Sequence, residues 1–346
     1  RKAISARGAS DDKGQVLTFV EACRAWKAVT GSLPIDITFL VEGAEEDGSK
    51  FLPEFIEANK DELKADVALV CDTGMWDQNT PAITSSLRGM VYEEVIVRCA
   101  DRDLHSGSFG GAAQNPIHVL SRIIAAIHDQ NGRITIKDFY DGVHETPTQV
   151  LEQWKKLNLT EEEFLGQVGL KHSAGEKGRL LLEQIQSRPT CDVNGIIGGY
   201  TGEGTKTVIA AEARAKISFR LVGDQDPAKI SANFEAFVRE RIPADCSVEF
   251  IHHKGSRALA LPHDFPALTA AKGALHDEWG VDPVVIGMGG SIPVGGDFKR
   301  TLGLDTLFVG YGLDDDRIHS PNEKYDLKSF HKGTRSWARI LAALAK

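Results

Sequence analysis

Helix-like and strand-like segments alternate at both ends of this sequence, whereas its middle has a different pattern. Residues 15–30 predict a helix, residues 35–43 a strand, residues 50–63 a second helix and residues 65–74 a second buried strand. The helix at 15–30 is expected to bury one apolar stripe: Val16, Leu17, Val20, Cys23 and Trp26. This alternation predicts an α/β layer with a largely parallel sheet, whose ligands lie at the carboxyl ends of its strands.

The middle of the chain predicts an α+β domain with an antiparallel sheet. Long strands are expected at residues 90–100, 207–222 and 246–253, with helices at 115–129 and 228–242. A polar helical excursion is expected over 140–169, and the α/β pattern returns near residue 256 with helices at 267–280 and 329–346 and strands at 282–287 and 305–312. We therefore predict a discontinuous α/β domain of residues 1–84 and 256–346, with residues 85–255 inserted into it.

Charge and cysteine usage narrow the classes of function. The 346 residues carry a formal net charge of −9, so a basic surface for nucleic acid or anionic membrane is not expected, and small molecules or other proteins are the expected partners. The five cysteines are scattered, with neither a CxxC pair nor a Cys/His cluster at zinc-site spacing. Reduced thiols, and thus a cytoplasmic location, are the expectation.

Acidic residues gather where predicted strands end. Glu45, Glu46 and Asp47 follow the first predicted strand, and Asp72 follows the second. Asp11 lies in a glycine-flanked loop ahead of the first helix, and His319 lies in a polar loop after a strand. Each alone is explained as well by a solvated loop, a turn or a helix cap.

Taken together, these side chains predict a metal site. Asp11, Glu46, Asp72 and His319 are expected at one edge of one sheet, and three oxygen ligands with one nitrogen suit zinc or manganese. Glu45, next to a ligand, is then free to act as a general base on the attacking water.

Seven motifs in order along nearly the whole chain resemble the M20 metallopeptidases, most closely the branch of cytosolic non-specific dipeptidases and carnosinases. They are RGASDDKG, VEGAEEDGS, VCDTGMW, DLHSGSFGG, TKTVIAAEARAKISFRLV, GGSIP and IHSPNEKY. The resemblance implies a zinc-peptidase catalytic domain, an αβα sandwich whose N-terminal strands are missing from this sequence, and an inserted α+β lid and dimerisation domain. It implies a homodimeric, metal-dependent dipeptidase for substrates with a free C-terminal carboxylate.

The resemblance also implies a site for two divalent ions, zinc or manganese. Asp11 would bridge both ions, Asp72 would hold the first, and Glu46 and His319 the second, while Glu45 would be the base and then the proton donor to the leaving amine. Asp11–Asp12 is expected to be a cis peptide. The family's first ion is also held by a His in an upstream HxD segment, and none of the ten residues before Asp11 is His, so this site lacks one ligand in the sequence.

Five further residues match substrate-contacting positions of the family. His105 would reach the partner subunit's site and stabilise the oxyanion, and Arg220 would bind the carboxylate of the substrate. Thr207 and Ser291 match substrate-contacting hydroxyls, and His253 is a poorer match. The alternatives are a core or turn role for His105, a strand-end salt bridge for Arg220, turn caps for the hydroxyls, and a solvated side chain for His253.

Departures from the family pattern keep two alternatives open. Gly287 and Met288 stand where related dipeptidases carry Arg and Glu, so a metal-dependent N-acyl amino acid amidase of the desuccinylase type is the alternative enzyme. Since the upstream His is missing, a catalytically inactive fragment or binding protein is the other alternative. A phosphate-binding loop at residues 198–207 is rejected, because Thr205 stands where the lysine is needed and a strand follows.

Overall fold

The computed structural model describes residues 2–262, 264–289 and 292–345, and these form two compact units. The described residues of 1–86, 260–288 and 292–346 make the first unit, and those of 87–259 with Gly289 make the second. Each unit has a hydrophobic core of its own.

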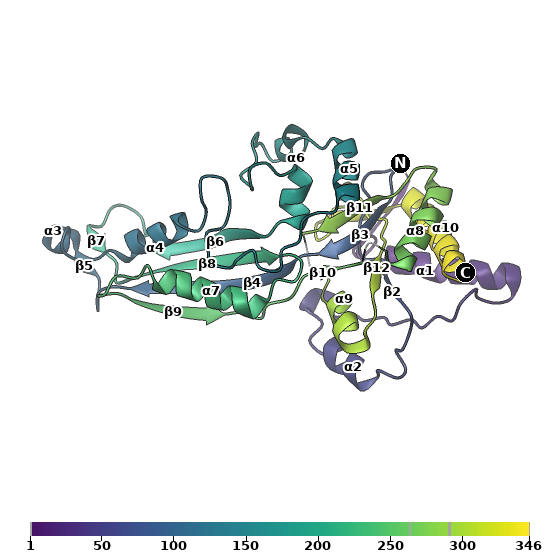
Figure 1. Cartoon of the computed structure of the whole chain (residues 1–346), viewed down its shortest axis with the longest axis horizontal. Helices are drawn as coiled ribbons and strands as arrows, with labels where there is room; N and C mark the ends of the chain where they lie inside the picture. The colour runs from purple at the N-terminus through teal and green to yellow at the C-terminus, as the bar shows by residue number, and fades with distance from the viewer. Residues whose placement is uncertain (1, 263, 290–291, 346) are drawn as a thin grey trace. The chain divides into compact units, whose positions relative to one another are not determined.

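The first unit contains a mixed sheet in the order β10 (Leu259–Ala260), β3 (Ala82–Leu87), β12 (Thr306–Phe308), β2 (Ala68–Val70), with β11 (Val284–Met288) also paired to β3 (Figure 1). β12 runs parallel to β2 but antiparallel to β3. The mixed α/β class is as predicted, but the sequence pattern did not reveal β3, which adds an antiparallel pairing to the predicted parallel one. Its polar residues Thr84, Ser85 and Ser86 interrupt the apolar pattern typical of a buried strand.

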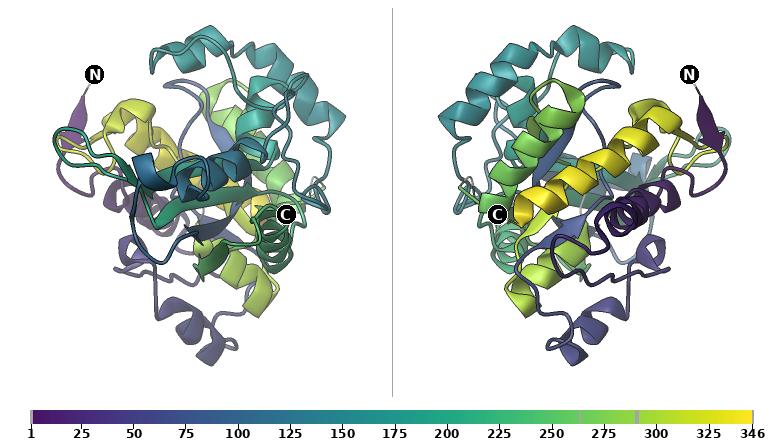
Figure 2. Two further views of the ribbon diagram at one scale, coloured as in Figure 1. Left: turned by 90° about the vertical axis from the view of Figure 1, so that its left-hand side faces the viewer. Right: turned by 90° about the vertical axis from the view of Figure 1, so that its right-hand side faces the viewer.

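Three helices of the first unit form a layer on this core. α10 (Leu327–Leu344) contacts both α1 (Lys13–Thr30) and α8 (Pro266–Trp279), and the right-hand view of Figure 2 shows the yellow α10 between them. The short helices α2 (Leu52–Ala58) and α9 (Pro293–Asp297) contact each other. The core joins the sheet to the helical layer through residues such as Ile83, Leu275, Leu307, Tyr311 and Trp337.

The buried face of α1 differs from the predicted stripe. Gln15, Thr18 and Ala22 are buried, whereas Leu17 is 47% exposed. The polar members are satisfied: the backbone N–H of Tyr311 donates to Gln15 Oε1 at 2.7 Å, and Thr18 donates to the carbonyl of Gln15 at 2.6 Å. Small and hydrogen-bonded side chains thus fill a face that periodicity assigned to larger apolar ones.

Residues 35–43 form no strand, which corrects the prediction for this segment. A strand needs a neighbour to satisfy its backbone groups, and none of the described strands pairs with these residues. Phe39 and Val41 are accordingly 49% and 69% exposed. The acids that follow lie in a 3₁₀ turn, Glu45–Asp47, instead of at a strand end.

The second unit contains an antiparallel sheet in the order β6 (Thr190–Gly198), β8 (Glu212–Leu221), β4 (Gly89–Arg98), β9 (Ser247–His252), as predicted for the middle of the chain. Alternate residues of β4 and β8 are buried, and α4 (Pro116–Ala125) and α7 (Pro227–Arg239) cover that face (Figure 1). The rings of Phe139, Phe219 and Phe234 meet in this core. On the opposite face, β8 carries the polar residues Glu212, Arg214, Lys216, Ser218 and Arg220.

Short elements complete the two units. β5 (Leu104–His105) pairs with β7 (Val208–Ile209), and α3 (Ser106–Phe109), α5 (Thr148–Leu157), α6 (Glu161–Gly166) and a π-helical turn (Glu183–Ser187) complete the second unit. In the first unit β1 (Ala3–Ser5) pairs with β13 (Lys324–Asp326), a π-helical turn spans Phe298–Leu302 and a 3₁₀ turn spans Asp314–Asp316. No helix in the described part of the chain is long and apolar enough to cross a membrane.

Candidate active site

Asp11, Glu46 and His319 come together in the first unit from three distant parts of the sequence. His319 Nε2 lies 2.9 Å from Asp11 Oδ2 and 2.8 Å from Glu46 Oε1. One ligand atom from each residue lies within 4.8 Å of the other two. Three of the four predicted metal ligands therefore share one small region.

Asp72 and Glu45 act electrostatically on the same region. Burial raises the pKa of Asp72, and the charge of Glu46 raises it further. Burial also raises the pKa of Glu45, followed by repulsion from Asp72, Glu46 and Asp11. Asp72 and Glu45 are thus close enough to the other acids to be repelled by their charges. Each of the two is harder to deprotonate than an isolated carboxyl group.

The donor set fits a divalent cation. Carboxylate oxygens with one imidazole nitrogen suit zinc or manganese, and no lysine or arginine among the described residues forms an ion pair with Asp11, Glu46 or Asp72. Burial, a hydrogen bond with Glu46 and the charge of Asp72 together raise the pKa of Asp11 to about 6. A cation would relieve this repulsion, which the protein's own basic residues leave largely uncompensated.

The neighbouring acid Asp12 is perturbed by the cluster. The Asp11–Asp12 peptide bond is cis, as the resemblance implied. Asp12 Oδ1 is buried without a hydrogen-bond partner, and burial, with the charges of Asp72 and Asp11, raises the pKa of Asp12 to about 8. Asp12 is therefore harder to ionise than an ordinary carboxyl group.

Glu323 holds the loop that carries Asp11, and sequence analysis missed this role. Its Oε1 accepts the backbone N–H groups of Ser10 and Asp11, each at 2.9 Å, and its Oε2 accepts the N–H of Gly8 at 2.8 Å and pairs with Arg7. Burial opposes ionisation, but these donors outweigh it and lower the pKa of Glu323. Its place in IHSPNEKY was the only signal, since an acid in a polar loop looks solvated.

Asp316 fixes the other side of the same loop. It is fully buried, and its Oδ2 accepts from Ser10 Oγ and from the backbone N–H of Leu313, both at 2.9 Å. Its Oδ1 pairs with Lys324 at 2.5 Å. Two buried carboxylates thus position the loop before Asp11 and the segment that leads to His319.

A close backbone approach places Asp72. A Cβ at Gly310 would lie 1.9 Å from the carbonyl oxygen of Thr73, so only glycine lets these two chain segments run against each other. The N–H of Met75 donates to Gly312 O at 2.9 Å along the same contact. Asp72 is therefore held by the neighbouring strand segment, at the carboxyl end of β2.

The second unit brings His105 and Thr207 together. His105 lies on β5 opposite Val208 of β7, its Nδ1 accepts the N–H of Gly107 at 3.0 Å, and its Nε2 is 3.4 Å from Thr207 Oγ1. The ring of His105 is exposed. It is oriented by backbone contacts but has a face open to solvent or to a partner.

The remaining predicted substrate residues lie elsewhere. Arg220 is on β8 opposite Met90 of β4. His253 pairs with Glu94, with Nε2 and Oε1 3.2 Å apart, and its ring lies edge-on to Tyr92, which is how a structural strand-end histidine is satisfied. Ser291 lies outside the described residues.

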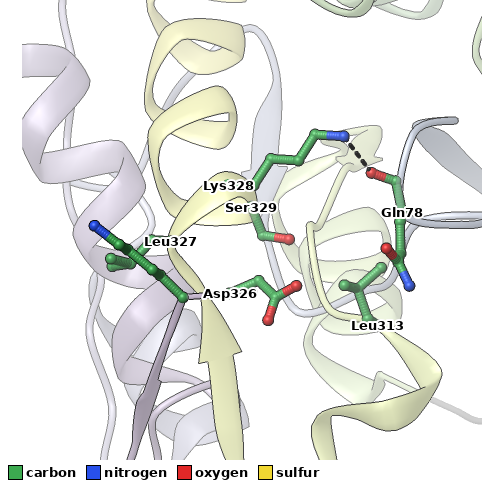
Figure 3. Close-up of a pocket in the computed structure, with 7 residues that line it drawn as sticks. Gln78, Leu313, Asp326, Leu327, Lys328 and Ser329 are labelled. Atoms are coloured by element: carbon green, nitrogen blue, oxygen red, sulfur yellow. Dashed lines mark hydrogen bonds between the residues drawn. The ribbon is translucent and has the colours of Figure 1, made fainter.

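A small pocket of about 210 Å³ in the first unit contains none of the predicted site residues. Lys328 Nζ bridges across it to the carbonyl oxygen of Gln78 at 3.0 Å (Figure 3). Its lining is Lys2, Gln78, Leu313, Asp326, Leu327, Lys328 and Ser329. Its few polar groups anchor the start of α10, and it lacks the convergent acids and imidazole of the metal-ligand cluster.

Comparison with known proteins agrees with this fold. Residues 2–343 match the family described as Peptidase family M20/M25/M40. The chain belongs to this family of peptidases, as the seven motifs indicated.

Two similar curated proteins are named as dipeptidases. The chain is 30% identical to human Beta-Ala-His dipeptidase, covering 98% of the chain and 68% of that protein. It is 32% identical to the Cys-Gly metallodipeptidase DUG1 of Saccharomyces cerevisiae, covering 98% and 71% respectively. Among solved structures it is similar to the M20 family metallo-carboxypeptidase Sso-CP2 of Sulfolobus solfataricus, with a TM-score of 0.83, 30% identity, and coverage of 99% of this chain and 78% of that one.

Proposed function

We propose that this protein is a metal-dependent dipeptidase that cleaves dipeptides with a free C-terminal carboxylate. The observation that carries the proposal is the convergence of Asp11, Glu46 and His319 within 4.8 Å, in a chain of a peptidase family whose named relatives hydrolyse dipeptides. Asp11, Glu46, Asp72 and His319 would hold two divalent ions, with zinc the first candidate and manganese the second. Bound there, such ions supply Lewis acidity toward the scissile carbonyl.

Glu45 is the proposed general base. It adjoins the ligand Glu46, and its raised pKa, caused first by burial and then by nearby acids, suits a group that accepts a proton from water and returns it to the leaving amine. Glu45→Gln should retain metal yet lower kcat by about 100- to 10,000-fold. A variant with near wild-type turnover and unchanged metal content would refute this role.

The second unit supports a homodimer in which His105 serves the partner's site. From Glu212 to Arg220, β8 covers eight residue steps, about 26 Å at 3.3 Å per step, and the β5–β7 pair that carries His105 and Thr207 lies beyond the Glu212 end. A dipeptide spans only about 7 Å. His105 and Arg220 of one chain therefore cannot contact the same dipeptide, so joint action requires two copies of the chain.

Mixing two inactive variants tests this arrangement. In a dimer of a Glu45→Gln chain and a His105→Ala chain, one site has both an intact Glu45 and an intact His105 from the partner. Randomly mixed C2 dimers should then regain about a quarter of wild-type activity. If His105 acts within its own chain, the mixture remains inactive.

The alternative enzyme is an N-acyl amino acid amidase, favoured by one observation. Met288 at the end of β11 offers no carboxylate for a substrate amino group. Assays of Cys-Gly and β-Ala-His beside N-acetyl and N-succinyl amino acids decide between the two, since a dipeptidase prefers the unblocked amine. A cytoplasmic location is proposed on the five free thiols.

A further inference from the structure

Two arginines of the second unit lie at one end of its β4–β8 strand pair. Met90 of β4 is directly opposite Arg220 of β8, and Gly89 is opposite Leu221; Arg88 immediately precedes this strand. Arg88 therefore lies at the end of the strand pair where Arg220 is, near enough for the charge of Arg220 to act on it. Their repulsion contributes, after burial, to lowering the pKa of Arg88 to about 10.

Neither guanidinium has an anionic partner among the described residues. Nε and Nη1 of Arg88 are buried without any hydrogen-bond partner, and neither arginine forms an ion pair with a described acid. Asp192 is the acid whose charge favours Arg88, but Asp192 is exposed and its Oδ2 accepts from Thr190 Oγ1 at 3.4 Å. A partly buried guanidinium with two buried nitrogens left unpaired is costly, and buried charges are normally paired.

The described residues around the Arg88 guanidinium leave it uncovered and include no acid that pairs with it. The backbone of Gly289 lies against Arg88, since a Cβ at Gly289 would be 2.7 Å from Arg88 Nη2. Met288, the residue before it, is apolar. A glycine that leaves a guanidinium uncovered by side chains, next to a second guanidinium, suits a planar carboxylate, which arginine binds through paired N–H donors.

We propose that Arg88 is a substrate-binding residue which, together with Arg220, forms a two-arginine subsite for the carboxylate of the substrate. This rests on the proposed dipeptidase function for the identity of the ligand, but the missing anion is a property of the second unit itself. Binding of a substrate carboxylate would give the Arg88 guanidinium the anionic partner that the fold does not provide.

The test compares Arg88→Met with Arg214→Met. Methionine keeps an unbranched side chain but removes the charge. Arg214 lies on β8, on the same face as Arg220, and is paired with Glu212 at 2.6 Å, so it is a matched control with its partner present. Arg88→Lys is the milder second variant, since it keeps the charge and loses the planar fork.

Kinetics give the first readout. Arg88→Met should lower kcat/KM for Cys-Gly by about 10- to 100-fold, mainly through KM, and leave activity toward the C-terminal amide of Cys-Gly at the wild-type level. For Arg88→Lys, kcat/KM for Cys-Gly should lie between the values for wild type and Arg88→Met. Arg214→Met should match wild type on both substrates. An equal loss on the acid and the amide would overturn the proposal.

Thermal unfolding of the metal-free protein gives a readout that needs no catalysis. Without ligand, Arg88→Met should raise the unfolding midpoint by about 2 °C or more, since it removes an unpaired buried charge, whereas a structural role predicts a decrease. Glycylglycine should stabilise wild type more than glycylglycinamide does, and Arg88→Met should abolish that difference. A difference that persists in Arg88→Met, or is absent in wild type, would overturn the proposal.

The two readouts separate failure of the subsite from failure of the proposed function. A wild-type protein that hydrolyses no dipeptide, yet is stabilised by the carboxylate of glycylglycine in an Arg88-dependent way, would refute the dipeptidase and retain the subsite. A dipeptidase that discriminates acid from amide equally well without Arg88 would refute the subsite alone.

Discussion

Glu323 Oε1 accepts the backbone N–H of Asp11 at 2.9 Å, so a carboxylate 312 residues away in sequence fixes the loop of the proposed bridging ligand. The same side chain also accepts the N–H groups of Gly8 and Ser10. The loop that carries Asp11 is thus positioned by hydrogen bonds to a buried carboxylate of the first unit.

Replacing this carboxylate should weaken the site without touching a ligand. In Glu323→Gln, the amide NH₂ would face backbone donors, so we expect a loss of about 1–3 kcal/mol in unfolding free energy and a 10- to 100-fold weaker metal affinity. Urea unfolding and zinc titration measure the two effects. Asp314→Asn, an exposed acid near the same loop, is the control and should change neither.

Metal affinity should depend on pH. Without metal, burial and the neighbouring acids raise the pKa of Asp11 to about 6, and the hydrogen bond with Glu46 raises the pKa of His319. Raised values mean that protons compete with the cation, because the ligands bind metal only when deprotonated. Affinity should therefore be highest above these pKa values and fall as pH drops through about 6.

Zinc titrations at pH 7.5 and pH 5.5 check this dependence. Below the pKa of a ligand, the cation must displace a proton from that ligand. Each such proton should weaken zinc binding by about tenfold per pH unit. Equal affinity at both values would show that Asp11 and His319 do not bind the cation.

A core substitution should affect the second unit alone. Phe219 is fully buried, and its ring centroid lies 5.1 Å from that of Phe234 and 5.8 Å from that of Phe139. Phe219→Ala should cost about 3–5 kcal/mol. Because the first unit has a separate core, zinc affinity should stay at the wild-type value, and a matching loss of zinc binding would contradict separate cores.

Sequence patterns predicted the mixed α/β class and the antiparallel sheet of the second unit, because β4 and β8 bury alternate residues and α4 and α7 cover one face. They failed at residues 35–43, where an apolar segment suggested a strand but none of the described strands pairs with it. A strand forms only where a neighbouring strand pairs with it, and the local sequence pattern does not say whether such a neighbour exists.

The site also contains residues that the sequence predicted and residues that it did not. Asp11, Glu46 and His319 were predicted to come together, because acids and a histidine in loops at the ends of predicted elements are conspicuous, and they do lie together. Glu323 and Asp316 were missed because they are bound by residues hundreds of positions away, the backbone N–H of Asp11 for Glu323 and the Ser10 hydroxyl for Asp316, and nothing in the local sequence marks a buried loop acid. Arg88 was missed because its significance lies in the partner it lacks.

Zinc binding to the metal-free protein, compared between wild type and His319→Ala, tests the central claim most directly. Isothermal titration at pH 7.5 should show wild-type binding that is weakened at least tenfold, or loses one equivalent, in His319→Ala, with the unfolding midpoint of the metal-free proteins unchanged because His319 is 63% exposed. Identical affinity and stoichiometry in the two proteins would contradict a metal centre built from Asp11, Glu46 and His319, and with it the proposed mechanism of hydrolysis.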